Sequence, residues 1–241
     1  IDEYGRATPR ILTVVGSRKH TGYGKNATEK LVSSLKGCDV VILSGLALGI
    51  DGIAHSTALK NNITTIAIPG SGLNKKSLYP STHVHLAEEI ITAGGTLISE
   101  LSPDTRAAQW TFPARNRIMS ALSDAVLIVE AEEKSGTLIT ARQALELGRD
   151  IGAVPGELFS PSSVGTNTLI REGAYIIASE DDLYALLHIS KESAMEIETN
   201  TYTDDEKVIM DLLIENTEKD TLLIKSNLSL ERFLTALSSL E

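Results

Sequence analysis

Short apolar runs without polar alternation recur along this chain, and most end at a glycine- or proline-containing turn that precedes a helical pattern. Such strands are typical of a parallel sheet covered by helices on both faces. The predicted strands are 11–15, 40–43, 64–68, 96–99, 125–129, 151–154 and 174–177, and the predicted helices are 24–35, 50–61, 81–93 with Ser81 as cap, 116–122, 137–147, 168–172 and 181–187. This order predicts an α/β fold with a doubly wound, mostly parallel sheet.

The end of the chain has a different pattern. Residues 189–203 are rich in Ser, Glu, Asn and Thr, a composition typical of a linker. Residues 204–241 show helical spacing of apolar residues, with a turn at 227–229. We therefore expect a sheet domain at 1–188, a linker, and a small helix-turn-helix unit at 204–241.

Composition excludes several classes of protein. Cys38 is the only cysteine, which excludes disulfides within the chain and a cysteine-rich zinc site. No apolar run approaches the roughly 20 residues of a membrane helix, and no secretory signal pattern opens the chain. We therefore expect a cytoplasmic protein that does not bind membranes. The pattern does not bring His55, His83 and His85 together, so we expect no metal site.

The net charge of −10 is unevenly distributed. Residues 1–176 contain 17 basic and 17 acidic residues, whereas residues 177–241 contain 5 basic and 15 acidic residues. A neutral sheet domain can still carry a local basic crevice that binds phosphates, whereas the acidic end of the chain is a poor candidate for that contact.

Polar turns follow several strand ends, which meet at one edge of a parallel sheet, where such sheets bind ligands. After the first strand, Ser17 and Arg18 offer a hydroxyl and a guanidinium to a phosphate, although such a tripeptide can also be an ordinary turn. After the second strand, Gly45 and Gly49 precede a helix whose N-terminal N–H groups attract anions. Asp51 is either a cap of that helix or part of the site.

A third turn, 69–72, is followed by Lys75 and Lys76, which either contact phosphate or remain solvated. The fourth is a proline-stiffened loop at a helix start, on which Phe112 is positioned to stack on a base and Arg115 to bind phosphate. Asn116 lies between the two arginines, and Arg117 either joins the site or pairs with a glutamate at a neighbouring strand end.

The fifth turn places a lysine and two hydroxyls around a glycine at a helix start, which is a compact phosphate cradle: Lys134, Ser135, Gly136 and Thr137. None of the glycine patterns is that of a dinucleotide site or a P-loop, and we expect no cofactor. Five such turns at one edge together predict phosphate binding.

At these turns the sequence resembles the DNA-processing protein A family (DprA, also called Smf). The stretches that carry the resemblance run from Gly16 to Ala174 and include GIDGIAH, FPARNR and SGTLITA. The resemblance implies an extended Rossmann-like fold, usually dimeric, that binds incoming single-stranded DNA during natural transformation, protects it and loads RecA. It also implies that the first, fourth and fifth turns line the DNA pocket.

The resemblance also sets expectations for the ends of the chain. The C-terminal helices are similar to the winged-helix domain of many members, and we expect this domain to be truncated before its wing. Some members carry a basic residue at the place where this sequence has Gln109-Trp110-Thr111, which predicts a lower affinity for DNA.

Two other functions remain open. The cytokinin-activating phosphoribohydrolases of the LOG superfamily carry a glutamate that acts on the sugar, and Thr140 stands at that position here. Without that carboxylate a hydrolase lacks its general base, so we expect no enzyme activity. A sensor of a small nucleotide would use the same phosphate cradles, and would not bind more tightly as a strand lengthens.

Overall fold

A computed structural model describes residues 8–189, 203, 205, 208, 209, 212, 219–226 and 228–240. Its centre is a sheet of seven parallel strands in the order β4-β3-β2-β1-β5-β6-β7. The strands are β1 (Arg10–Val15), β2 (Val40–Ser44), β3 (Thr65–Ala67), β4 (Thr96–Leu97), β5 (Ala125–Ile128), β6 (Asp150–Ala153) and β7 (Tyr175–Ile176). The prediction of a doubly wound α/β sheet is confirmed, and every strand pair in it is parallel.

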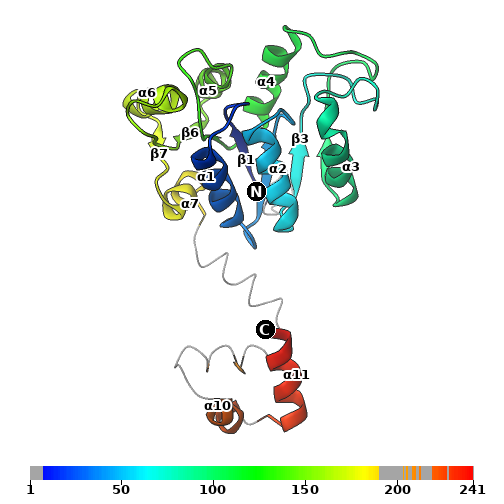
Figure 1. The fold of residues 1–241 in the computed structure, drawn as a ribbon, viewed down its shortest axis with the longest axis vertical. Coiled ribbons are helices and arrows are strands. Elements are labelled where there is room, and N and C mark those ends of the chain that lie inside the picture. Colours follow the sequence, from blue (N-terminus) through cyan, green and yellow to red (C-terminus); the bar gives the residue numbers. More distant parts are fainter. Residues whose placement is uncertain are drawn as a thin grey trace. The chain divides into compact units, whose positions relative to one another are not determined.

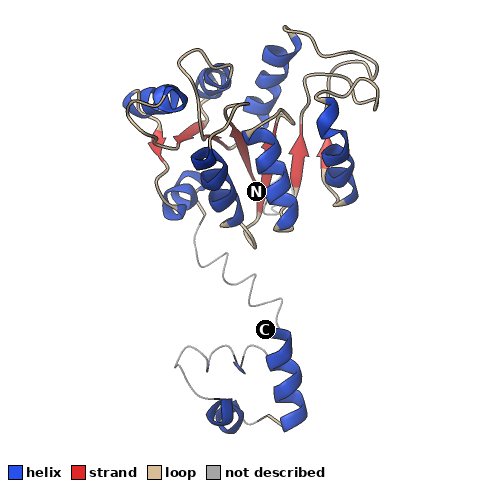
Figure 2. Ribbon diagram, viewed as in Figure 1, coloured by secondary structure: helices blue, strands red, loops and turns tan. Residues whose placement is uncertain are grey.

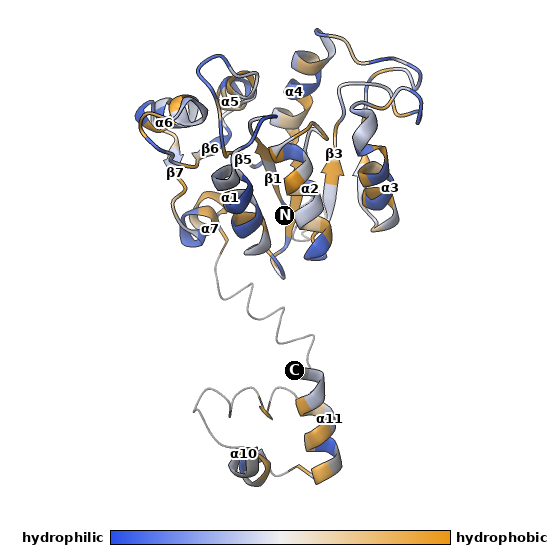
Figure 3. Cartoon of the chain, in the orientation of Figure 1, coloured by the Kyte–Doolittle hydropathy of each residue, from blue (hydrophilic) through white to orange (hydrophobic). Residues whose placement is uncertain are grey.

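Helices cover both faces of the sheet (Figures 1 and 2). The helices of this unit are α1 (Gly22–Ser33), α2 (Ile50–Lys60), α3 (Val84–Thr92), α4 (Thr111–Leu122), α5 (Thr137–Glu146), α6 (Val164–Arg171) and α7 (Glu180–Leu187), with short 3-10 turns at Ser81–His83 and Pro161–Ser163. One apolar core packs α1, α2 and α7 against β1, β2 and β5, and a second packs α4 and α5 against the opposite face. The apolar strands lie between the two helical layers (Figure 3).

Three predicted helix starts were wrong. Helix α6 begins at Val164, four residues before the predicted start at 168. Helix α4 begins at Thr111, five residues before the predicted start, so Phe112 lies in a helix rather than on a loop. A proline is compatible with a first helical turn because its missing N–H has no partner there, and Pro113 therefore does not delay the helix. Ser81 does not cap α3, because it opens a 3-10 turn that leads into the helix at Val84.

The direction of the strand order reverses between β1 and β5. The chain proceeds outward from β1 through β2 and β3 to β4, crosses the sheet, and then proceeds outward again from β5. At such a point the loops after the two central strands diverge, one towards each face, and leave a crevice at the carboxyl edge. The turns after β1 and β5 therefore lie on opposite sides of this crevice and face each other across it.

The chain divides into two compact units, 1–191 and 192–241. In the second unit, α10 (Lys219–Ser226) and α11 (Leu230–Leu240) share a small apolar core with Ile209. The carboxylate of Asp205 accepts two hydrogen bonds from the Arg232 guanidinium, at 2.6 and 2.7 Å. Most of the predicted linker and the 227 position of the predicted turn lie outside the described residues, and the helix-turn-helix unit stays a prediction.

None of the helices in the described part of the chain combines the length and the apolar character that crossing a membrane requires.

Candidate functional site

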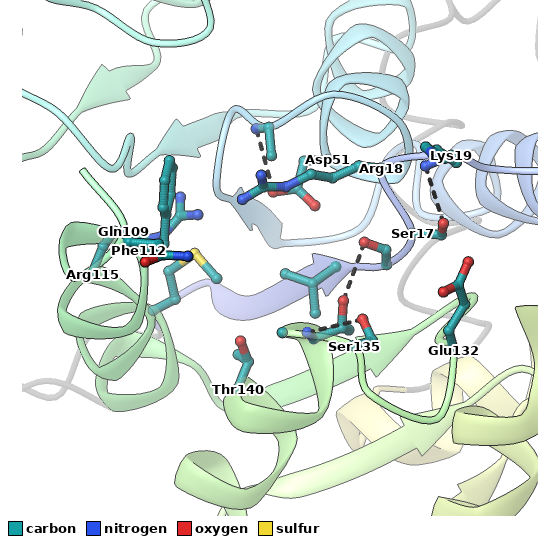
Figure 4. Close-up of a pocket in the computed structure, with 16 residues that line it drawn as sticks. Ser17, Arg18, Lys19, Asp51, Gln109, Phe112, Arg115, Glu132, Ser135 and Thr140 are labelled. Carbon is teal, nitrogen blue, oxygen red and sulfur yellow. Dashed lines mark hydrogen bonds between the residues drawn. The ribbon is translucent and has the colours of Figure 1, made fainter. Parts of the chain in front are cut away.

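A cavity of about 520 Å³ opens at the crevice between β1 and β5 (Figure 4). Its walls come from four segments: the end of β1 with the turn after it, the β2–α2 loop with the start of α2, α4 with the residues just before it, and the turn that leads into α5. Its lining residues are Val15, Gly16, Ser17, Arg18, Lys19, Ala47, Asp51, Gln109, Phe112, Arg115, Met119, Glu132, Ser135, Gly136, Thr137 and Thr140. The first, fourth and fifth predicted turns thus meet in one cavity.

The turn after β1 presents its polar groups at the surface. The Ser17 hydroxyl accepts a hydrogen bond from the Lys19 N–H at 3.1 Å, which closes the turn. Arg18 is exposed, and its guanidinium carbon lies 4.8 Å from the centre of the Phe112 ring. This is a cation–π contact. Arg18 and Lys19 are the two cationic side chains of the cavity that solvent reaches freely.

The turn that opens α5 faces the turn after β1. Gly136 is the N-cap residue of α5, so the positive end of the helix dipole lies at the cavity, while the N–H groups of Leu138 and Ile139 donate to the Ser135 and Gly136 carbonyls at 3.1 Å. The Ser135 hydroxyl accepts from the Thr137 N–H at 3.2 Å, and the Thr137 hydroxyl donates to the Gly16 carbonyl at 3.2 Å. That second bond ties the two turns together. Lys134 is exposed beside the cavity but does not line it.

A buried carboxylate organises the loop between β2 and α2. The Asp51 Oδ2 atom accepts from the Gly45 N–H at 3.1 Å and from the Ala47 N–H at 3.4 Å, so Asp51 holds its loop rather than capping its helix by the usual N-cap bond. Burial raises the pKa of Asp51, and the positive charge of Arg115 opposes that rise.

Arg115 is buried rather than exposed to solvent. Only 7% of its surface is exposed, and its Nη1 donates to the Gly45 carbonyl at 2.6 Å and to the Ile68 carbonyl. Its Nε donates to the Asn116 Oδ1 at 3.1 Å. Burial lowers the pKa of Arg115 to about 10, so the guanidinium remains charged at neutral pH.

The two glycines of the second turn have spatial roles. The Gly45 N–H is bonded to Asp51, and a Cβ at this residue would lie 2.2 Å from the Arg115 Nη1. Gly49 has φ +78°, and a Cβ there would lie 2.2 Å from the Ser17 carbonyl oxygen. Neither glycine lines the site cavity, although Gly45 lines a small pocket beside it, together with Arg18 and Phe112. Their contact with phosphate stays a prediction: the N–H and carbonyl of Gly45 are bonded to Asp51 and Arg115, and Gly49 packs against the turn after β1.

Arg117 and Asn116 lie outside the cavity lining. Arg117 forms an exposed ion pair with Glu100, as in the predicted alternative in which it pairs with a glutamate at a neighbouring strand end. Glu130, the glutamate at another strand end, instead accepts from the N–H and hydroxyl of Thr21. Asn116 is buried and supports the Arg115 side chain. In the third turn, Lys75 pairs with Glu88 at 2.6 Å.

Several cavity residues were not in the predicted site, namely Lys19, Ala47, Gln109, Met119 and Glu132. Lys19 and Glu132 lie next to predicted turns, so their neighbourhood in the sequence was a usable signal. Met119 carries no such signal, because its place in the cavity depends on the packing of α4. His55 and His83 are bonded to Thr65 and to the Leu46 carbonyl, and no metal-binding group of three ligands occurs among the residues that the structure describes.

The family model of DNA recombination-mediator protein A matches residues 4–188. Among curated proteins, the chain is 44% identical over 172 residues to Protein Smf of Escherichia coli, which covers 71% of this chain and 46% of that protein. It is 42% identical over 175 residues to the DNA processing protein DprA of Bacillus subtilis, covering 73% and 58%. The chain thus spans about half the length of the curated relatives it matches.

Solved structures show the same fold. The chain is similar to DNA processing protein A of Streptococcus pneumoniae, with a TM-score of 0.67, 39% identity and coverage of 74% of this chain and 61% of that one. A structure of DNA processing protein A from Helicobacter pylori, described by its single-stranded DNA binding mode, has a TM-score of 0.67 and 35% identity, covering 75% and 80%. A molybdenum cofactor binding protein of Rippkaea orientalis, at 20% identity and a TM-score of 0.53, shares the fold alone.

Proposed function

Because this chain belongs to the DNA recombination-mediator protein A family, we propose that it binds single-stranded DNA without reading its sequence. The observation that carries the proposal is the pair of facing turns at the β1–β5 crevice, which bring exposed Arg18, the hydroxyls of Ser17 and Ser135, and the start of α5 to one cavity. The relatives supply the class of ligand, since one of the similar structures is described by its single-stranded DNA binding.

Backbone phosphates fit these groups better than base edges do. Hydroxyls, backbone N–H groups and a guanidinium recognise phosphate oxygens, and such contacts carry no sequence information. Phe112 and Tyr79 meet edge to face, with ring centres 5.8 Å apart, and offer limited room for a stacked base. We therefore expect weak sequence preference and a strong dependence on salt.

Binding of fluorescent oligo-dT of increasing length tests this proposal. Affinity should rise from a mononucleotide to a strand that fills the crevice, and duplex DNA should bind less well. Arg18→Ala should weaken binding about tenfold, or about 1.4 kcal/mol, while Arg117→Ala should not weaken it. Equal affinity for duplex, or affinity that does not change with salt, would contradict the proposal.

The same length series tests the alternatives. A nucleotide sensor or a phosphoribohydrolase would bind a mononucleotide as tightly as a strand. The cavity contains the carboxylates of Asp51 and Glu132, but Thr140 stands where the hydrolases carry their glutamate. Release of a free base from a nucleoside monophosphate would support the enzyme.

We further propose that the chain forms a homodimer and that it loads RecA onto the bound strand. The family description as a recombination mediator is consistent with a role beside a recombinase, and the dimer rests on the resemblance of the sequence to the family. Light scattering checks the dimer. RecA loading is measured as the RecA-dependent ATP hydrolysis on strands precoated with a single-strand binding protein, which this chain should accelerate and its Arg18→Ala variant should not.

A further inference from the structure

Two arginines at the cavity have opposite surroundings. Arg18 is exposed and no hydrogen bond or ion pair is found for its side chain among the described residues, whereas Arg115 is 7% exposed and donates to carbonyl groups after two different strands. Gly45 follows β2 and Ile68 follows β3, so one guanidinium joins the carboxyl ends of neighbouring strands. Both hydrogens of Nη1 and the hydrogen of Nε are used in these bonds and the bond to Asn116.

The loop that Arg115 holds is also fixed from within. The Gly45 N–H donates to the Asp51 carboxylate while the Gly45 carbonyl accepts from Arg115, so both polar groups of this residue are bonded to buried charges. Asp51 also accepts from the Ala47 N–H, and Ala47 lines the cavity. The loop conformation therefore depends on two charged side chains of opposite sign.

This loop in turn contacts the turn after β1. The Ile50 N–H donates to the Ser17 carbonyl at 3.2 Å, and the left-handed backbone of Gly49 lies directly against Ser17 and Arg18. A continuous series of contacts thus runs from Arg115 through the β2–α2 loop to the backbone that carries the exposed Arg18. No step in this series involves a ligand.

We propose that Arg115 is a positioning residue, which sets the Ser17–Arg18 turn through the β2–α2 loop and does not itself contact phosphate. This inference rests on the proposed binding of single-stranded DNA, and it assigns a different task to each of the two arginines. Gly45 belongs to the same arrangement, because the absence of a Cβ at this residue leaves the space that the Arg115 guanidinium occupies.

The salt dependence of binding separates a contact from a positioning role. A residue that neutralises a phosphate lowers the slope of log K against log salt by about 0.7 when it is removed, whereas loss of a positioning residue weakens binding at every salt concentration alike. Oligo-dT binding is therefore measured over a salt series for the wild type, Arg18→Ala and Arg115→Ala, with thermal unfolding to verify that each variant is folded. We expect Arg115→Ala to bind about tenfold more weakly with the wild-type slope, and Arg18→Ala to lose about 0.7 of the slope.

A double-mutant cycle with Gly45→Ala gives a second readout. Alone, this substitution should weaken binding about as much as Arg115→Ala, because the new Cβ displaces the guanidinium. In the Arg115→Ala background, the space is free and the added loss should be less than about twofold. If Arg115→Ala does not fold, the salt series is measured with Gly45→Ala and Arg115→Lys instead. Both variants should keep the wild-type slope of log K against log salt.

The outcomes distinguish this inference from the proposed function. A slope reduced by Arg115→Ala as much as by Arg18→Ala, or additive losses in the cycle, would overturn the positioning role and leave DNA binding intact. A wild-type protein that does not bind oligo-dT would overturn the proposed function. In that case hydrogen exchange without DNA tests the positioning, since Arg115→Ala should speed exchange at 16–19 and Arg117→Ala should not.

Discussion

The charged residues of the crevice form two layers that differ in burial and in their partners. The outer layer, Arg18, Lys19 and Lys134, is exposed to solvent. The inner layer, Asp51 and Arg115, is at least nine-tenths buried and bonded to backbone groups of neighbouring loops. The comparison teaches that residue type alone does not assign a task at a binding site: an arginine with three of its five donors bonded within the protein is suited to fix geometry, and one whose donors are free is suited to capture a ligand.

Removal of the inner carboxylate should produce the largest effect on stability. Asp51→Ala leaves the Arg115 guanidinium without its nearby negative charge and two loop N–H groups without an acceptor. We expect the free energy of unfolding to fall by about 3 kcal/mol, because both charge and hydrogen bonds are lost in a buried place. Urea denaturation measures this. The matched control in the same cavity is exposed Glu132, whose change to alanine should cost less than about 0.5 kcal/mol; equal costs would remove the distinction between the layers.

The buried side chain of His55, behind the inner layer, should make the free energy of unfolding depend on pH. Burial, with the nearby charges of His83 and Arg115, lowers the pKa of His55 from 6.5 to about 3. The unfolded chain therefore binds a proton between pH 6.5 and 3 that the folded chain does not, and stability is lost as pH falls through this range. Between pH 7 and 5 the loss due to His55 is about 2 kcal/mol, at 1.36 kcal/mol per pH unit.

Unfolding of the wild type and His55→Gln at several pH values isolates this contribution. The difference between the two proteins should shrink as pH falls, because the variant has no proton to bind. The raised pKa of Asp51 has the opposite sign, since its stability contribution falls as pH rises, but it is present in both proteins and cancels. Exposed His85→Gln is the control. A difference that stays constant from pH 7 to 5 would show that His55 is protonated in the folded protein.

Removal of Lys134, at the edge of the outer layer, should have a smaller effect, and on DNA binding alone. Lys134 flanks the fifth turn without lining the cavity. Lys134→Ala should weaken oligo-dT binding about threefold, or about 0.7 kcal/mol, as expected for one exposed charge contact. Lys76→Ala, another exposed lysine, should have no effect. Equal losses from the two lysines would mean that net charge rather than position controls binding.

The smallest effect is expected at Arg117, two residues beyond Arg115 on the same helix. Its ion pair with Glu100 is exposed, and such pairs contribute little to stability. Arg117→Ala should change the free energy of unfolding by less than about 0.5 kcal/mol and leave DNA binding unchanged. A tenfold loss of binding would place this arginine in the outer layer.

The sequence was sufficient for the sheet and for the first, fourth and fifth turns, which meet at the cavity. Apolar runs located the strands, and the loops that carry Ser17 and Thr137 follow β1 and β5, which placed both at one edge because parallel strands all end on the same side. The inner layer could not be predicted in this way. Whether Arg115 points to solvent or to strand ends depends on where α4 begins, and the sequence pattern placed that start five residues too late. Long-range contacts such as Arg115 with Gly45, 70 residues apart, leave no local pattern.

The position of Arg18 over the Phe112 ring affects the entropy of binding. A free arginine side chain samples many rotamers, and it loses up to about 2 kcal/mol of conformational freedom when it is immobilised. A guanidinium that already rests on an aromatic ring has lost part of this freedom before any anion arrives. Under the proposed function, capture of a phosphate by Arg18 would therefore require less ordering than capture by a lysine of the same turn, and Phe112 would contribute to affinity without touching the ligand.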